Sequence, residues 1–399
     1  MVSNRRTERR SANLQTVKLS NLTLIFGLIN QMGSVSRAEL AQEAELSPTT
    51  VSSLVDELIA GGVVREVGMG ETVTSGRKPI MLEVDPAGGA VAAVELRRNG
   101  YCLELFDLKA NCRVTMEESV TDYLRMGESL IRGIRRALHR AGVPESKLFG
   151  ISVGVPGVID KTTGRVISST ILPIDEENPF FDELRDRFPD IKLRLGNESC
   201  FSAYMEKVQR KRIHSLVYVE INEGIGAGIV VNDHIFTGAF GNAGELGHVS
   251  VDVNGPRCKC GNRGCLELLA NAPAIREKLA SCGSSHIGGL SFEEARCALE
   301  LGDAEATSAV KEICRLLASG INSMINILNP EAVILGGEVI QLGDVFLEIL
   351  KEQIDEISFK PGTQTLTVEF SSVQGNPVTQ GGARYLLDRI FQDGGFVIS

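Results

Sequence analysis

Short apolar periods separated by polar breaks occupy the first part of the chain. From Asn21, apolar residues recur three and four positions apart as far as Met32, and Gly33 follows. This spacing places apolar side chains on one face and predicts a helix that ends at the glycine. Ser36 then opens the sequence Ser-Arg-Ala-Glu, a capping box that predicts a second helix through Ala44.

A third helix and a pair of strands follow. Ser47 is a suitable N-cap and Pro48 suits the first helical position, so this helix is predicted to run from there to Gly61. Two β-rich segments, 63–67 and 80–84, are separated by a polar, glycine-containing turn. Three helices followed by two strands predict a winged helix-turn-helix domain.

The polar face of the third helix and the tip of the wing carry the chemistry of this domain. Small hydroxyl side chains can bond phosphates and base edges without blocking entry to the major groove, and basic side chains at a wing tip reach phosphate or the minor groove. A small helical domain that binds another protein is the alternative, but the hydroxyl-rich helix and basic wing favour operator DNA. The candidate DNA-binding residues are Ser47, Thr49, Thr50, Ser52, Ser53, Arg77 and Lys78.

Beyond Asp85-Pro86, apolar β-rich runs alternate with helical patterns. The runs include AVAAVEL at 90–96, LFGISVGVPGVID at 148–160, SLVYVEINEGIGAGIVVN at 215–232 and INILNPEAVILGG at 325–337. A glycine turn is expected within TQGGARYLL near the end of the chain. This alternation predicts an α/β fold of two successive halves, and a cleft between two lobes usually holds a small ligand.

These patterns divide the 399 residues into three parts. Residues 1–20 form a basic arm, 21–84 the winged helix-turn-helix domain, and 85–399 an effector-binding domain. Within the last, we expect one lobe over about 85–195 together with the C-terminal helix. The second lobe is expected over about 196–383.

Charge is distributed unevenly over these parts. The net charge is −10, but residues 1–84 hold nine basic and nine acidic residues, so the excess acid lies in the large domain. Five basic residues of the first twenty face only Glu8. The arm is therefore either a nucleic-acid contact or a solvated tail.

Composition bounds the class of protein. Hydrophobic residues make up 43% and charged residues 23%, as in globular proteins. No apolar run reaches the length of a membrane span and no signal peptide is recognisable, so we expect a cytoplasmic protein without membrane partners. Nine cysteines, an odd number, argue against a disulfide framework.

The segment GPRCKCGNRGCLELL at 255–269 concentrates three cysteines within eight residues. Its glycines let the backbone bend so that the sulfurs can converge. A metal site and free buried thiols both fit these residues. A zinc ribbon that binds nucleic acid does not, because no second C-x2-C pair is present.

Several motifs in a consistent order carry a family resemblance. ISVGVPGVID, GIGAGIVVN, GNAGELGHVSVD, CKCGNRGCLE and INILNPEAVILGG together resemble the ROK family of sugar kinases and sugar-responsive repressors. The resemblance covers nearly the whole chain and implies an actin-like, hexokinase-type fold of two α/β lobes. With the winged helix-turn-helix in front, the chain is similar to the family's xylose- and N-acetylglucosamine-type repressors.

The resemblance also implies two sets of binding residues. A structural zinc ion would be held by His248, Cys258, Cys260 and Cys265, and we expect it to orient His248 and Glu267 toward the cleft. A sugar would be bound by Asn197, Glu198, Glu245, His248 and Glu267.

Departures from the kinase pattern bear on function. Kinases of this family have an aspartate as general base where this chain has Glu198, and the extra methylene misplaces the carboxylate. Their first phosphate turn has an aspartate and paired glycines, whereas this chain has AVELRRNGYC with Glu95, Arg97 and Arg98. Glu198 is thus a vestigial base position, and we expect no catalytic residue. The glycines of a second loop, at 224, 226 and 228, are retained and can serve lobe packing.

Two functions are therefore compared. The first is a regulator that binds a palindromic operator as a homodimer or tetramer, with a sugar or sugar phosphate in the cleft shifting the spacing of its DNA-binding domains. The second is an ATP-dependent hexose kinase with an appended DNA-binding domain. The altered phosphate turn favours the regulator.

Overall fold

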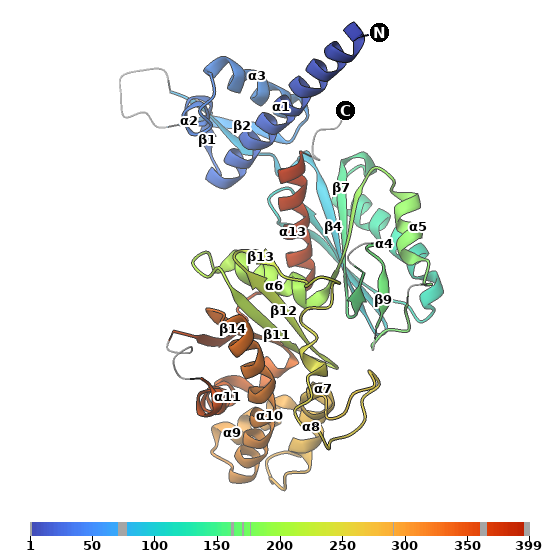
Figure 1. Ribbon diagram of the computed structural model, residues 1–399, viewed down its shortest axis with the longest axis vertical. Coiled ribbons are helices and arrows are strands. Elements are labelled where there is room, and N and C mark those ends of the chain that lie inside the picture. Colours follow the sequence, from blue (N-terminus) through green and yellow to red (C-terminus); the bar gives the residue numbers. More distant parts are fainter. Residues whose placement is uncertain are drawn as a thin grey trace.

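The computed structural model describes residues 2–70, 78–160, 163–169, 171–175, 177–289, 291–359 and 365–394, with side chains from residue 16 onward. An N-terminal domain stands at one end of an elongated molecule, followed by two α/β lobes (Figure 1). Within the described residues, no helix combines the length and apolar character that crossing a membrane requires.

The N-terminal domain is a small helical domain with a three-stranded sheet in the order β1-β3-β2. Its elements are α1 (Val2–Met32), β1 (Val35–Ser36), α2 (Arg37–Glu43), α3 (Pro48–Ala60), β2 (Val64–Met69) and β3 (Ile80–Val84). The Ser36 capping box is present, and the Ser47 side chain accepts a hydrogen bond from the Thr50 amide. The second and third helices and both strands of the wing thus form close to where the sequence predicts them.

The first helix differs from the expectation. It does not begin at Asn21, because α1 already starts at Val2 and includes residues 2–20 of the basic arm. No glycine or proline interrupts the chain before Gly27, so nothing in the local sequence ends the helix on its N-terminal side.

Lobe one is a mixed five-stranded sheet in the order β10-β7-β4-β5-β6. Helices α4 and α5 pack over one face and the C-terminal helix α13 covers β4 and β7 on the other (Figure 1). The elements are β4 (Ala90–Arg97), β5 (Gly100–Asp107), β6 (Cys112–Ser119), α4 (Met126–Ala141), β7 (Leu148–Val155), β8 (Val158–Ile159), β9 (Val166–Ser168), α5 (Phe180–Arg187), β10 (Lys192–Asn197) and α13 (Pro377–Asp393).

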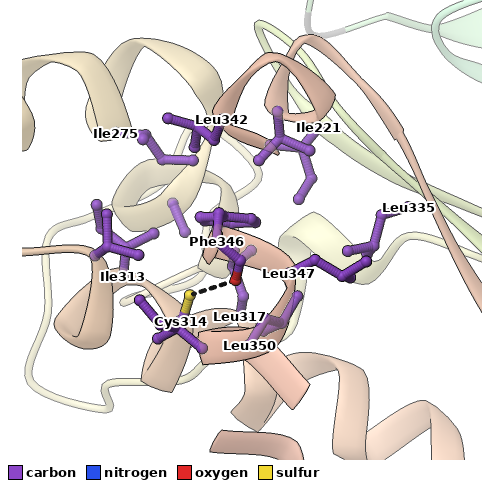
Figure 2. Packing of buried hydrophobic residues seen from close by; sticks show 14 of the residues in the cluster. Ile221, Ile275, Ile313, Cys314, Leu317, Leu335, Leu342, Phe346, Leu347 and Leu350 are labelled. Atoms are coloured by element: carbon purple, nitrogen blue, oxygen red, sulfur yellow. Dashed lines mark hydrogen bonds between the residues drawn. The ribbon is translucent and has the colours of Figure 1, made fainter. Parts of the chain in front are cut away.

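Lobe two is a second five-stranded sheet in the order β13-β12-β11-β14-β15. The elements are α6 (Glu198–Gln209), β11 (Leu216–Ile221), β12 (Ile225–Val231), β13 (His234–Ile235), α7 (Leu266–Ala270), α8 (Ala272–Ala280), α9 (Phe292–Glu300), α10 (Ala304–Leu328), β14 (Ala332–Gly337), α11 (Gly343–Ile357) and β15 (Thr367–Phe370). Figure 2 shows its core, where Ile313 and Leu317 of α10 lie beside Phe346 and Leu350 of α11.

The expected glycine turn near the end of the chain is wrong, because TQGGARYLL lies inside α13. The glycines serve close packing instead. A Cβ added at Gly381 would lie 1.9 Å from the backbone oxygen of Phe201 in α6. Glycine at this position lets the two helices cross closely where the lobes meet.

The C-terminal end of α13 packs against the N-terminal domain. Leu387 and Ile390 belong to one buried apolar cluster with Leu22 and Ile25 of α1. The rings of Phe391 and Phe26 lie 4.6 Å apart between centroids. The N-terminal domain therefore shares its core with lobe one through this helix.

Candidate functional site

A cavity of about 730 Å³ lies between the lobes, at the carboxyl ends of β4, β7, β10 and β11. Ligands of α/β folds usually bind at this end of a sheet. All five predicted sugar-binding residues line this one cleft: Asn197, Glu198, Glu245, His248 and Glu267.

Asn197 and Glu198 stand where β10 passes into α6. Asn197 is the N-cap of α6: its Oδ1 accepts from the Ser199 amide at 2.9 Å, while its Nδ2 donates to the Gly157 oxygen at 3.2 Å. Burial, with Glu220 and Glu95 nearby, raises the pKa of Glu198 well above its ordinary value. Glu198 is therefore readily protonated and able to donate as well as accept a hydrogen bond.

Glu220 is a cleft residue that the sequence analysis did not single out. It lies within the otherwise apolar sequence LVYVEI of β11, and burial raises its pKa to about 7, with a further contribution from Glu95. Its carboxylate accepts from Asn222 Nδ2 at 3.1 Å and from Ser199 Oγ at 3.3 Å. An acid inside an otherwise apolar strand was the available signal.

The metal-side wall of the cleft comprises Glu245, His248 and Glu267. Glu245 Oε2 lies 4.0 Å from His248 Nε2, and burial raises the pKa of Glu245 despite that imidazole. Glu267 Oε2 accepts from the Ile225 amide at 3.2 Å, so the residue after Cys265 and Leu266 is fixed against β12. The three side chains converge although they come from a short 3-10 helix with the residue before it and from the first turn of α7.

Behind this wall lie the four predicted metal ligands. The ligand atoms of His248, Cys258, Cys260 and Cys265 all lie within 4.8 Å of one another. The Sγ atoms of Cys260 and Cys265 are 3.6 Å apart, and Cys258 Sγ is 3.8 Å from His248 Nδ1. Tetrahedral zinc with Zn–S bonds of about 2.3 Å would separate two sulfurs by about 3.8 Å, so the donor set fits zinc.

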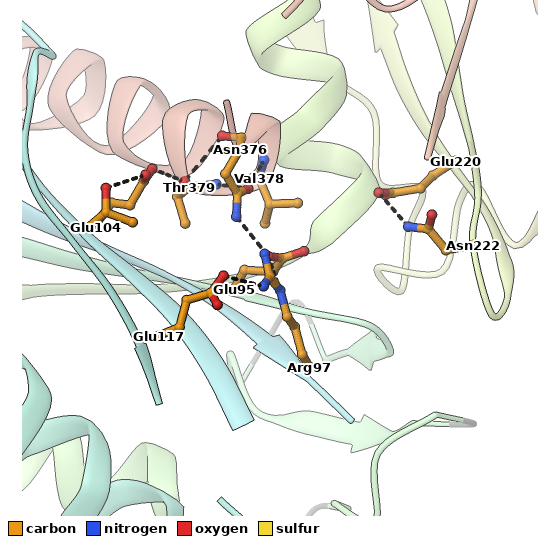
Figure 3. A network of polar contacts seen from close by, with 10 residues as sticks. Glu95, Arg97, Glu104, Glu117, Glu220, Asn222, Asn376, Val378 and Thr379 are labelled. Atoms are coloured by element: carbon orange, nitrogen blue, oxygen red, sulfur yellow. Dashed lines mark hydrogen bonds and ion pairs between the residues drawn. The ribbon is translucent and has the colours of Figure 1, made fainter. Parts of the chain in front are cut away.

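The turn-side wall is formed by Glu95, Arg97, Arg98 and Glu117 at the β4–β5 turn and on β6. Figure 3 shows Arg97 between two carboxylates: its Nε lies 2.7 Å from Glu95 Oε2 and its Nη1 lies 3.0 Å from Glu117 Oε1. Asn376, the N-cap of α13, donates from Nδ2 to Glu95 Oε2 at 2.8 Å. The sequence did not indicate this link, because the partners are far apart along the chain.

Two of the retained glycines, Gly226 and Gly228, lie in β12 and allow close packing within lobe two. A Cβ at Gly228 would lie 1.9 Å from the backbone oxygen of Ser199 in α6. The glycine therefore lets α6 lie directly on β12, which is a structural use that does not need a nucleotide.

The candidate DNA-binding residues gather at the start of α3 and on the wing. Val51, Leu54 and Val55 are buried, while Thr49 and Ser53 are exposed on the opposite side of the helix. The remaining positions are less uniform: Ser47 and Lys78 are exposed, Thr50 and Ser52 are half-buried, and Arg77 lies outside the described residues. The Ser47 hydroxyl is 2.8 Å from that of Thr50, so this pair already serves the cap.

Known proteins resemble this chain over nearly its whole length. A model of the ROK family matches residues 99–389. The xylose repressor of Bacillus subtilis is 29% identical over 385 residues, covering 93% of this chain and 96% of the relative.

Solved structures extend the likeness to three dimensions. The crystal structure of a ROK family transcriptional regulator, a homologue of the E. coli MLC protein, superposes with a TM-score of 0.81 at 25% identity. It covers 96% of this chain and 98% of its own. The ROK hexokinase from Thermus thermophilus has a TM-score of 0.62 at 24% identity and covers 75% of this chain and 99% of its own. This second likeness confirms the two-lobed fold alone.

Proposed function

Because the chain belongs to the ROK family, matching it over residues 99–389, we propose that it is a sugar-responsive transcriptional repressor. The N-terminal winged helix binds operator DNA, and a sugar in the cleft between the lobes changes that binding. The relative named as a xylose repressor and the similar ROK transcriptional regulator support this function.

Helix α13 is the observation that carries the proposal, because it joins the two sites. At its N-terminal end the N-cap residue Asn376 bonds Glu95 on the wall of the cleft. At its last turn Phe391 packs against Phe26 in the N-terminal domain. Seventeen residues of helix span about 26 Å. A change at the cleft can therefore move the N-terminal domain through a rigid element, without an unstructured linker.

DNA recognition is proposed for the exposed face of α3 and the wing. Thr49 and Ser53 face away from the core and can enter the major groove, and Lys78 supplies a cation beside it. Arg77 and the basic arm are proposed to contact phosphate. A palindromic operator then requires two such domains, from a homodimer or tetramer, and the protein acts in the cytoplasm, where its operator lies.

Sugar recognition is proposed for the metal-side wall together with Asn197 and Glu198. Carboxylates and amides can hold vicinal hydroxyls through paired hydrogen bonds. Bound zinc would fix the segment that carries Glu245 and His248. The geometry suits this division: His248 faces the cysteines through Nδ1 and leaves Nε2 toward Glu245 and the cleft. Zinc has a structural role here and no step of catalysis is assigned to it.

A hexose kinase is the weaker alternative. Arg97 and Arg98 occupy the turn on which a kinase of this family would wrap phosphate with glycine amides. Glu198 stands at the position of the general base with one methylene too many. Both features support a binding protein in which the sugar is not turned over.

The proposal can be tested with the full-length protein and fluorescently labelled operator DNA selected from random sequence. We expect tight binding whose anisotropy signal changes with at least one sugar of a panel of pentoses, hexoses and amino sugars. Coupling between two sites is typically about 1–3 kcal/mol, which corresponds to a change in DNA affinity of roughly five- to 150-fold. Sequence-specific binding that no sugar alters, or ATP-dependent sugar phosphorylation at about one turnover per second, would contradict it.

A further inference from the structure

The charged residues that line the cleft limit the kind of ligand that can bind there. Nine glutamates and two arginines line the cavity, and no lysine is among the described lining residues. A phosphate ester carries about two negative charges at neutral pH and needs cations or free amides to bind. Arg97 and Arg98 are the permanently charged cations of the described lining that could supply that contact.

All three guanidinium nitrogens of Arg97 contact carboxylates. Its Nε and Nη2 lie 2.7 and 2.6 Å from Glu95 Oε2, and its Nη1 lies 3.0 Å from Glu117 Oε1. Glu95 is in turn fixed by Asn376 and its side chain is only 16% exposed (Figure 3). A phosphate at Arg97 would have to displace a carboxylate that α13 holds in place, and would then face it as a like charge.

Arg98 is also paired, across the mouth of the cleft. Its Nε lies 2.7 Å from Oε2 of Glu223, in the β11–β12 turn of the opposite lobe. The hydroxyl of Tyr123 donates to the backbone oxygens of Arg97 and Arg98, so the turn itself is anchored. Arg98 contacts Glu223 through Nε alone, so a phosphate that approached its other N–H groups would meet the Glu223 carboxylate as a like charge.

On the other side of the cleft, the acids have no such compensation. Within the described part of the chain, no lysine or arginine forms an ion pair with Glu198, Glu220 or Glu267. Both carboxyl and carboxylate groups accept hydrogen bonds from hydroxyls, and in their ionised form these acids also repel phosphate.

We infer that the cleft selects an unphosphorylated sugar, and that Glu95, Glu117 and Glu223 exclude phosphate esters by occupying Arg97 and Arg98. This inference rests on the proposed function and deepens it by naming the ligand class. It also assigns the turn-side wall a role in specificity, in the place where a kinase of this family would bind nucleotide.

The first arm of the test compares matched ligands by isothermal titration calorimetry on the full-length protein. The pairs are glucose with glucose 6-phosphate and N-acetylglucosamine with its 6-phosphate, and inorganic phosphate and tripolyphosphate serve as probes for anions alone. We expect each phosphate ester to bind at least tenfold more weakly than its parent sugar, and neither inorganic anion to bind at millimolar concentration. An ester that binds as tightly as its parent, or a saturable anion site, would overturn the inference.

The second arm of the test removes the negative charges that pair with Arg97 and Arg98. The triple variant Glu95→Gln, Glu117→Gln and Glu223→Gln keeps the side-chain size but removes three charges, so we expect it to bind tripolyphosphate at least tenfold more tightly than the wild-type protein. The control is Glu348→Gln, an exposed change on α11 outside the cleft, which should gain nothing. No gain in the triple variant would show that the glutamates do not exclude anions.

Folding of the variant is checked by circular dichroism. Should the triple variant not fold, Glu223→Gln alone still frees Arg98 at a surface-exposed ion pair, and a smaller gain is expected. A protein that excludes anions but responds to no sugar would count against the repressor proposal, while the exclusion itself would stand. A protein that responds only to a sugar phosphate would remain a repressor but refute the selectivity.

Discussion

The two walls of the cleft hold glutamates in different ways. On the turn-side wall Glu95 and Glu117 come from β4 and β6 of one sheet and are paired with Arg97. On the metal-side wall Glu245 lies in an irregular segment next to the four clustered ligand atoms. On the turn-side wall, β-strands position the glutamates and ion pairs with Arg97 offset their charge. On the metal-side wall, no strand or long helix positions Glu245, and we propose that a metal ion holds this segment in place.

The largest expected effect comes from removing the metal ligands. Changing Cys258, Cys260 and Cys265 to serine should release about one zinc per chain, because hydroxyls are poor ligands for zinc compared with thiolates. The sugar response should be lost while lobe one stays folded. Metal analysis and operator-binding titrations measure the two outcomes. The control is Cys297→Ser, an exposed cysteine of α9, and unchanged zinc in the triple variant would contradict the metal site.

The next effect is on sugar affinity alone. Glu245→Gln replaces a charged acceptor on the metal-side wall by a neutral one of the same size. Loss of a hydrogen bond to a charged group costs about 1.5–3 kcal/mol, so the sugar should bind tenfold or more weakly. Operator binding without sugar should be unchanged, as it should be in the control Glu348→Gln. A full sugar response in Glu245→Gln would remove this residue from the binding site.

The pH dependence of the free energy of unfolding should distinguish the buried Glu220 from the glutamates that form ion pairs. Burial raises the pKa of Glu220 from 4.5 to about 7, so the folded protein binds this proton more tightly than the unfolded chain does. The free energy of unfolding should therefore fall as the pH rises from about 4.5 to 7. Glu220→Gln cannot ionise and should lose less stability over this interval. Urea unfolding at several pH values tests this, and parallel curves for both proteins would contradict it.

The smallest effect is expected at the mouth of the cleft. Glu223→Gln breaks the ion pair with Arg98, in which both side chains are about half exposed. Exposed pairs contribute about 0–1 kcal/mol, so the free energy of unfolding should change by no more than that. The difference should shrink further in high salt. A loss of several kcal/mol would show that this pair holds the lobes together.

Short sequence patterns were sufficient to predict most elements of the N-terminal domain. The Ser36 capping box and the Ser47 cap with Pro48 fix helix starts within one turn of the chain, so α2 and α3 follow from a few adjacent residues. The start of α1 was missed because a helix without a breaker can continue past its apolar pattern. The spacing of the three cysteines alone fitted either a metal site or free thiols, and only the family resemblance added His248 to the predicted cluster.

The tertiary structure alone decided how the cleft is charged and how it is linked to the N-terminal domain. The contact of Asn376 with Glu95 joins residues 281 positions apart, and that of Arg98 with Glu223 joins opposite lobes. Such pairs leave no period, cap or spacing in the sequence. The sequence thus determined which elements form and which residue types are available. Only the packing of distant strands and helices determined that the arginines are paired with glutamates, that Glu220 is buried, and that α13 connects the cleft to α1.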